Sequence, residues 1–318
     1  MTLDWLSAYL IFAVFTVVVT IGLAQLLHLQ MGLAGIGNFG IVGFFGLGMY
    51  ACGVLQVRLP WPDSWGLVWP FLISLVLAVV ISGLAGVLIG WMISDLNSDG
   101  ILVGTMGFAS IIYYLSLTEK ALTGGAEGMA VPDYPFDIGS GKANSLTWLG
   151  ILVVVVAAIL YYVYRVHRSP YGRLLVATGQ NEPLARSLGK PTFRTKLVMF
   201  SIGSAGMGLL GGLHEVMLHF IRPTELGIEV TLAAMVGLVL GGSARVWGAV
   251  VGTLLTAGLF DIVVQLYLPL PASWYHQAMP VVREMVFGAL LIAVLLIRPL
   301  GVLGDMRRDK FVRRPGSD

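Results

Sequence analysis

Charged residues are scarce in this chain. Only 11% of its 318 residues are Asp, Glu, Lys or Arg, 57% are hydrophobic, and the mean hydropathy is +0.87. Soluble domains carry about 25% charged and about 45–50% apolar residues. So little charge does not suit the surface of a soluble enzyme, a nucleic-acid-binding protein or a disordered chain. The composition leaves a polytopic membrane protein, whose side chains face lipid or other helices.

Cysteine and early positive charge are also lacking. Cys52 is the single cysteine, so no intrachain disulfide can form, and we interpret it as a small packing residue. The first apolar run reaches Leu27, with Asp4 as the only early charge. A cleavable signal has a basic start and a shorter apolar core. We therefore expect a retained first membrane helix.

Enzyme motifs are missing as well. Gly189-Lys190 is followed by Pro191, so it is not an ATP-binding P-loop. His214 and His219 are five residues apart, whereas a zinc protease helix needs a spacing of four. No Gly-x-Ser-x-Gly nucleophile turn occurs. We expect no catalytic site, no metal and no cofactor on this chain.

Long apolar stretches are abundant. A bilayer core about 30 Å thick needs roughly 20 residues of helix. We therefore predict an all-α polytopic membrane protein of about eight or nine transmembrane helices in one domain, residues 1–304. The candidate spans are 5–27, 32–57, 66–93, 100–118, 146–164, 196–221, 229–245, 247–267 and 280–298. The second contains eight glycines, so we expect a broken, re-entrant or closely packed helix there.

The few cations are concentrated in two places, which predicts the orientation. Thirteen of the 19 lie at 165–196 and from 298 to the end: Arg165, Arg168, Arg173, Arg186, Lys190, Arg194 and Lys196, then Arg298, Arg307, Arg308, Lys310, Arg313 and Arg314. Cytoplasmic loops are enriched in Lys and Arg. We expect segment 165–195 and the tail 305–318 to be cytoplasmic, and the more acidic loop 119–145 and the N-terminus to be external, in a cytoplasmic (inner) membrane.

Ionisable residues inside apolar spans are candidates for function. Glu215, His219 and Arg222 have helical spacing, which predicts one shared face, and Asp261 is a second isolated charge. The stripe is either a charge-satisfied structural feature or the wall of a polar pathway. Small-residue pairs such as Gly208/Gly212 predict tight helix packing or a mobile interface.

The basic segment 165–195 contains the signals of a short helix. Asn181 is a plausible cap, Pro183 suits the first turn, and Gly189 suits the C-terminal stop. A short basic helix on the cytoplasmic side could dock into a groove of a soluble partner. The alternative is an ordinary solvated loop.

This segment resembles the coupling loop of ABC-importer permeases, most closely those for branched-chain amino acids. That family's loop reads Ser-Pro-[Phe/Tyr]-Gly-Arg, then Glu-Asn-Glu, then Ala and Leu-Gly. The matching residues are Ser169 to Arg173, Asn181-Glu182, Ala185 and Leu188-Gly189, with Gln180 in place of the first Glu. The resemblance makes Gly172, Arg173, Asn181, Glu182, Ala185 and Gly189 candidates for coupling to an ATPase.

Other blocks agree in order, and the resemblance covers about residues 20–304. Leu122 to Met129 is similar to the family's external Leu-Thr-Gly-Gly-x-x-Gly-Leu loop, so Thr123, Gly124, Gly125 and Gly128 are candidates for receiving a binding protein. The early glycine-rich stretch carries Ile36, Asn38 and Ile41 where many relatives have Gln, Ser and His. The pathway candidates are Asn38, Phe39, Phe44, Glu215, His219 and Asp261.

The resemblance implies a permease subunit of an ATP-driven ABC importer. Its expected partners are a second permease subunit, two ATPase subunits that bind ATP and Mg, and an external solute-binding protein. The leading substrates are branched-chain amino acids. The alternative is a secondary transporter or channel for a small solute, such as another amino acid, an amide or urea. An intramembrane enzyme is disfavoured because no paired catalytic constellation occurs in the sequence, and a structural scaffold would leave the ordered polar loops unexplained.

Overall fold

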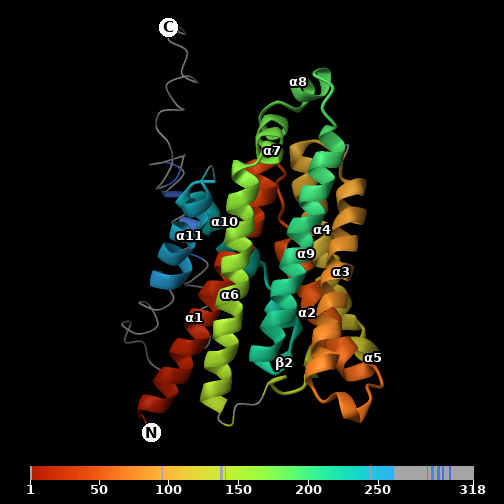
Figure 1. The fold of residues 1–318 in the computed structure, drawn as a ribbon, viewed down its shortest axis with the longest axis vertical. Helices are drawn as coiled ribbons and strands as arrows, with labels where there is room; N and C mark the ends of the chain where they lie inside the picture. Colours follow the sequence, from red (N-terminus) through yellow and green to blue (C-terminus); the bar gives the residue numbers. More distant parts are fainter. Residues whose placement is uncertain are drawn as a thin grey trace.

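The fold is a bundle of long apolar helices (Figure 1). This computed structural model describes residues 2–260 except 95, 137, 138, 140 and 244, with the backbone alone at 2–8, 259 and 260, and isolated positions between 285 and 301. Within this part, seven helical segments are long and apolar enough to cross a membrane: Tyr9–Leu33, Ile41–Arg58, Val68–Met92, Ser98–Thr118, Gly141–Arg168, Thr192–Leu218 and Pro223–Gly241. The predicted all-α membrane fold is confirmed.

The helices follow the predicted spans closely. They are α1 (Thr2–Leu27) with the π-helical η1 (His28–Leu33), α2 (Ile41–Arg58), α3 (Val68–Met92), α4 (Ser98–Thr118), α6 (Gly141–Arg168), α9 (Thr192–Leu218) and α10 (Ile228–Gly241). The expected span 247–267 begins as the short helix α11 (Val246–Thr253) and continues as the π-helical η5 (Leu254–Phe260). The predicted span 280–298 lies outside the described residues.

Burial separates the inner helices from the more lipid-facing ones. The apolar window of Tyr9–Leu33 is 67% buried and those of α2 and α9 are each 61% buried, against 22% for α3 and α4, and α9 packs against both α2 and α3. Leu84, Trp91 and Val103 are more than 60% exposed. Exposed apolar faces of this extent are rare on soluble proteins but suit contact with lipid.

Glycine allows the central helices to approach closely. A Cβ on Gly48 of α2 would overlap the Gly208 backbone of α9, and one on Gly86 of α3 would lie 2.7 Å from the Ser204 Cβ. In lipid, helix association depends on such close packing. The predicted tight packing is confirmed at Gly208 and at the paired glycines of α10 and α11, where Gly241 meets Gly248 and Gly252.

The two ends of the bundle differ. One end carries the short helices α7 (Pro170–Gln180) and α8 (Glu182–Ser187), at the top of Figure 1; we call it the α7–α8 end. The opposite end carries α5 (Lys120–Thr123), η3 (Gly125–Glu127), η2 (Asp63–Trp65) and a two-stranded antiparallel sheet of β1 (Met129–Ala130) and β2 (Phe220–Ile221); we call it the β-pair end. In the sheet, Met129 pairs with Ile221 and Ala130 with Phe220.

Candidate functional site

The second span is broken, as its glycine content predicts. Residues 34–40 are not helical, Gly35 has φ +68°, and α2 begins only at Ile41. Irregular backbone inside a membrane span needs partners for its polar groups, or a cavity beside it. Here Phe39 N–H donates to Thr105 Oγ1 of α4 (3.0 Å).

Asn38 holds this unwound stretch together. Its amide donates to Gln30 Oε1 (2.7 Å), its carbonyl oxygen accepts the Gly40 N–H (2.7 Å), and only 1% of the residue is exposed. Gln30 in turn donates to the Phe200 carbonyl of α9 (2.9 Å). The predicted pathway residue Asn38 is therefore buried in this structure, where its side chain stabilises the unwound backbone by hydrogen bonds.

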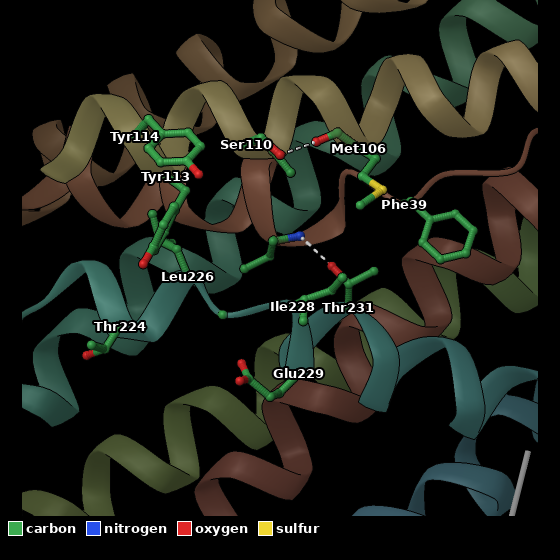
Figure 2. A pocket seen from close by; sticks show the side chains of 13 residues that line it. Phe39, Met106, Ser110, Tyr113, Tyr114, Thr224, Leu226, Ile228, Glu229 and Thr231 are labelled. Atoms are coloured by element: carbon green, nitrogen blue, oxygen red, sulfur yellow. Dashed lines mark hydrogen bonds between the residues drawn. The ribbon is translucent and has the colours of Figure 1, made fainter. Parts of the chain in front are cut away.

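A cavity of about 440 Å³ lies beside the unwound stretch, and we call it the α2–α4–α10 pocket. It is bounded by the start of α2, the middle of α4, η4 (Pro223–Leu226) and the first turn of α10 (Figure 2). Its volume is in the range of ligand-binding pockets. The lining residues are Phe39, Val42, Met106, Ala109, Ser110, Tyr113, Tyr114, Thr224, Leu226, Gly227, Ile228, Glu229 and Thr231.

The pocket has an apolar and a polar part. Glu229 is the only charged residue in its lining, and it lies in the first turn of α10. Thr231 is 1% exposed and accepts the Val42 N–H (3.2 Å), which links α10 to the start of α2. Figure 2 shows Glu229 on the opposite side of the pocket from Ser110 and Met106.

The predicted pathway residues have different positions. Phe39 lines the pocket, whereas Phe44 is fully buried between the Phe108 and Phe200 rings, at centroid distances of 4.5 and 5.6 Å. Phe44 is a core residue here. Asp261 lies outside the described residues.

The predicted stripe of Glu215, His219 and Arg222 on one helix face is wrong. α9 ends at Leu218 because His219 adopts a left-handed conformation with φ +57°, and Arg222 lies beyond β2. His219 instead packs edge-on against the Tyr134 ring, at 4.5 Å. Glu215 is fully buried and accepts a hydrogen bond from Gln56 Nε2 of α2. The turn to β2 separates the three side chains.

The short helix predicted after Asn181 is confirmed, with its caps. The side-chain Oδ1 of Asn181 accepts the Leu184 N–H (3.1 Å), Pro183 is in the first turn, and Gly189 has φ +73° just past the end. The preceding helix α7 is capped by Ser169, whose Oγ accepts the Gly172 N–H (3.0 Å). Gly172 lies so close to the Val166 carbonyl that a Cβ would overlap it.

Glu182 links α8 to α9. Its carboxylate forms ion pairs with Lys196 of α9 and with Arg186 (3.2 Å) in its own helix. Partial burial tends to raise the pKa of Glu182, but the hydrogen bond and charge of Lys196 outweigh it and hold the pKa below its ordinary value. A cavity of about 440 Å³ beneath α8 is lined in part by Glu182, Arg186 and Lys196. The ion pair of Glu182 with Lys196 therefore attaches α8 to α9 at the edge of this cavity.

α8 also presents apolar side chains to the outside. Leu184 in α8 and Leu188, the residue that caps its C-terminus, are 56% and 69% exposed. Arg173 is exposed on α7, while Ala185 is buried at 4%. Exposed leucines on a polar, projecting segment are typical of a protein docking surface.

α7 contacts the unwound stretch directly. A Cβ on Gly179 would lie 3.0 Å from backbone atoms of Leu33, Ala34 and Gly35. Tyr171 at the other end of α7 donates its hydroxyl to the Thr195 carbonyl of α9 (3.1 Å). The α7–α8 end is therefore in contact with both the broken span and the central helix.

The loop predicted from Thr123 to Gly128 is compact. Gly124, Gly125 and Gly128 have φ values of +80°, +65° and +80°, a region that favours glycine. Thr123 Oγ1 donates to the Ser116 carbonyl (2.9 Å) and accepts the Gly125 N–H (3.2 Å). A Cβ on Gly128 would overlap the Ile221 carbonyl of β2. The glycines therefore allow this loop to lie against β2, the strand that follows α9.

Glu229 was not among the predicted pathway residues, although it lines the α2–α4–α10 pocket. It begins the predicted span 229–245, and an ionisable residue at that place was the available signal. The sequence did not mark Tyr113, Ser110 or Thr231 as pocket residues, because hydroxyl residues are common in membrane helices. Among the described residues, no group of three or more His, Cys, Asp or Glu side chains could hold a metal ion.

Comparison with known proteins identifies relatives over most of the chain. The family model described as "Branched-chain amino acid transport system / permease component" matches residues 8–295. The high-affinity branched-chain amino acid transport system permease protein LivM of Salmonella typhimurium is 26% identical over 316 residues, covering 92% of this chain and 69% of that protein.

Other relatives carry different names. The probable branched-chain amino acid transport permease LivM of Methanocaldococcus jannaschii is 22% identical, over 73% of this chain and 68% of its own length. The autoinducer 2 import system permease protein LsrC of Salmonella typhimurium is 25% identical, over 76% of this chain and 66% of its own length. No solved structure matches this chain. The family match, the seven long apolar helices and the ordered α7–α8 segment agree: this multi-pass membrane protein belongs to the family of permease components of branched-chain amino acid transport systems.

Proposed function

We propose that this chain is a permease subunit of an ATP-driven importer that moves branched-chain amino acids delivered by an external binding protein. Its partners are a second permease subunit and two ATPase subunits, which bind the ATP and Mg. The observation that carries the proposal is the α7–α8 segment, which projects from the bundle and contacts the broken span through Gly179. Family membership and the LivM relatives support the substrate class.

The mechanism follows from these contacts. An ATPase subunit that binds the exposed Leu184 and Leu188 in a groove would move α8 when ATP brings the two ATPase subunits together. The Glu182–Lys196 ion pair passes that movement to α9, and Gly179 passes it to residues 34–40. Because residues 34–40 adjoin the α2–α4–α10 pocket, movement at the α7–α8 end alters the middle of the bundle.

The test is co-purification with the cognate ATPase, combined with leucine uptake into proteoliposomes. Leu184→Asn with Leu188→Asn should abolish ATPase association and uptake, while Leu122→Asn, an equally exposed leucine near the β-pair end, should retain the ATPase. Retained ATPase in the double variant would remove α8 from the docking role. Uptake by the chain alone, without ATPase, would instead identify a secondary transporter or channel.

The LsrC relatives favour a second candidate substrate, autoinducer 2. Competition of labelled leucine uptake by valine, isoleucine and autoinducer 2, with the cognate binding protein present, separates the two. Leucine uptake that valine and isoleucine inhibit and autoinducer 2 does not inhibit supports the proposal. Absence of leucine uptake, with uptake of labelled autoinducer 2 in its place, replaces its substrate.

A further inference from the structure

We propose that the α2–α4–α10 pocket is a transient binding site for a zwitterionic amino acid with a branched apolar side chain, and that Glu229 receives its ammonium group. This inference rests on the proposed function and names a site for its substrate. Four independent features of the pocket carry it: its charge, its apolar wall, its hydroxyl groups and its place beside broken backbone.

The first feature is a single negative charge. Glu229 is the only charged group in the lining, and no described residue forms an ion pair with it. The start of α10 stabilises negative charge at this position. A carboxylate within a membrane span is costly and generally serves a pathway or a ligand. A carboxylate at this place can form a charge-assisted hydrogen bond with a primary ammonium.

The second feature is the apolar wall. Phe39, Val42, Met106 and Leu226 line the pocket from three different segments. Met and aromatic side chains adapt to apolar ligands of different shape. A wall of this kind accepts the side chains of leucine, isoleucine and valine alike.

The third feature is a set of hydroxyl groups. Tyr113, Ser110 and Thr224 lie in the lining, and Figure 2 shows the Tyr113 hydroxyl directed toward the part of the pocket near Thr224. A phenol or an alcohol can donate a hydrogen bond to a carboxylate. The pocket thus offers donors for the ligand's carboxylate and an acceptor for its ammonium.

The fourth feature is location. Discontinuous membrane helices commonly border substrate sites, since their free ends and unwound backbone provide polar groups inside the membrane. The pocket adjoins residues 34–40, and α7 contacts the same stretch at Gly35. Tyr114 and Ile228 are 63% and 48% exposed at its edge. Because lipid would not solvate Glu229, we expect the second permease subunit to cover this opening.

The experiment is photolabelling of the assembled importer in proteoliposomes with a diazirine analogue of leucine, followed by peptide mapping. Labelling should fall on the peptides that contain Phe39, Met106 and Leu226, and leucine should suppress it. In Glu229→Gln, the leucine concentration that halves labelling should rise about 10- to 100-fold, the usual effect of losing a charge-assisted hydrogen bond. Glu225→Gln, a nearby carboxyl outside the pocket lining, should leave it unchanged.

A second competitor separates ammonium binding from a structural effect. 4-Methylpentanoate has the carboxylate and branched chain of leucine but no ammonium, so the intact protein should bind it at least 10-fold more weakly. In Glu229→Gln this preference should disappear, whereas a folding defect would weaken both competitors equally and leave their ratio unchanged. An unchanged ratio, or labelling confined to other helices, would overturn the inference.

Failure of this inference is distinguishable from failure of the proposed function. If leucine uptake depends on ATP and on the binding protein but labelling maps elsewhere, the pocket assignment alone is wrong. If uptake without ATPase persists in the same vesicles, the proposed importer function is wrong.

Discussion

At the scale of single residues, position in the fold determines what a polar group does. Asn38 and Glu215 both lie in apolar spans, and both are buried and hydrogen-bonded, so they stabilise helix packing. Glu229 is another ionisable residue of a span, yet it borders a cavity. Burial with a partner separates the structural groups from the candidate ligand-binding group.

The Gln56–Glu215 pair leads to a stability prediction. Gln56→Leu removes a donor from a fully buried carboxyl group and should destabilise the protein by about 1–3 kcal/mol. The double variant with Glu215→Leu should recover part of this loss, since replacing both partners by apolar groups is often nearly neutral. Unfolding in detergent measures both. A double variant at least as unstable as the sum of its single changes would contradict the prediction.

Glu182 leads to a prediction of pH dependence. Its pKa lies below the ordinary 4.5 because of Lys196, so the ion pair stabilises the attachment of α8 at higher pH and is lost as pH falls through the lowered pKa. A distance between spin labels on Ser187 and α9 should stay constant from pH 7 to about 5 and broaden at lower pH. Glu182→Gln should show the broad distribution throughout. A wild-type distribution that does not respond to acid would contradict this.

At the scale of elements, α8 was predictable from its caps, whereas the contacts that α7 makes were not predictable. Asn181, Pro183 and Gly189 are local signals, and local signals determine where a short helix begins and ends. The contact of Gly179 with Gly35 joins residues far apart in sequence, and nothing in either segment indicates the other. The same holds for the pairing of β1 with β2.

The Gly179 contact makes a testable element-scale prediction. Gly179→Ala would place a Cβ 3.0 Å from backbone atoms of Leu33 to Gly35, so α7 must shift away from the broken span. Leucine uptake should fall about tenfold or more, while ATP hydrolysis by the assembled complex persists. Gly150→Ala in α6, which has no atom within 4 Å of the new Cβ, should behave like the wild type. Equal loss of ATP hydrolysis and uptake would argue against a coupling contact.

At the scale of the whole molecule, charge at the two ends of the bundle predicts orientation. Seven cations between 165 and 196 lie at or near the α7–α8 end, and the more acidic loop 119–145 lies at the β-pair end. The positive-inside rule assigns the α7–α8 end to the cytoplasm. A reporter fused after Ser187 should be cytoplasmic and one fused after Ala143 external. The reverse pattern would overturn the orientation and, with it, access of an ATPase to α8.

The class of protein, the short helix α8 and the seven described spans could be predicted from the sequence, and most span boundaries agree to within a few residues. These follow from hydropathy, charge placement and caps, which act locally along the chain. The break in the second span was also predictable, because its glycine load disfavours a regular helix.

Which polar residues face a cavity depends on contacts between distant helices and could not be predicted. Phe44 and Phe39 are five residues apart, yet one is in the core and the other lines the pocket. The left-handed turn at His219 ended a helix that periodicity would have continued through Arg222. Glu229, Phe39 and Tyr113 line one cavity only because α2, α4 and α10 converge. Long-range helix packing, which no local pattern encodes, determines that convergence.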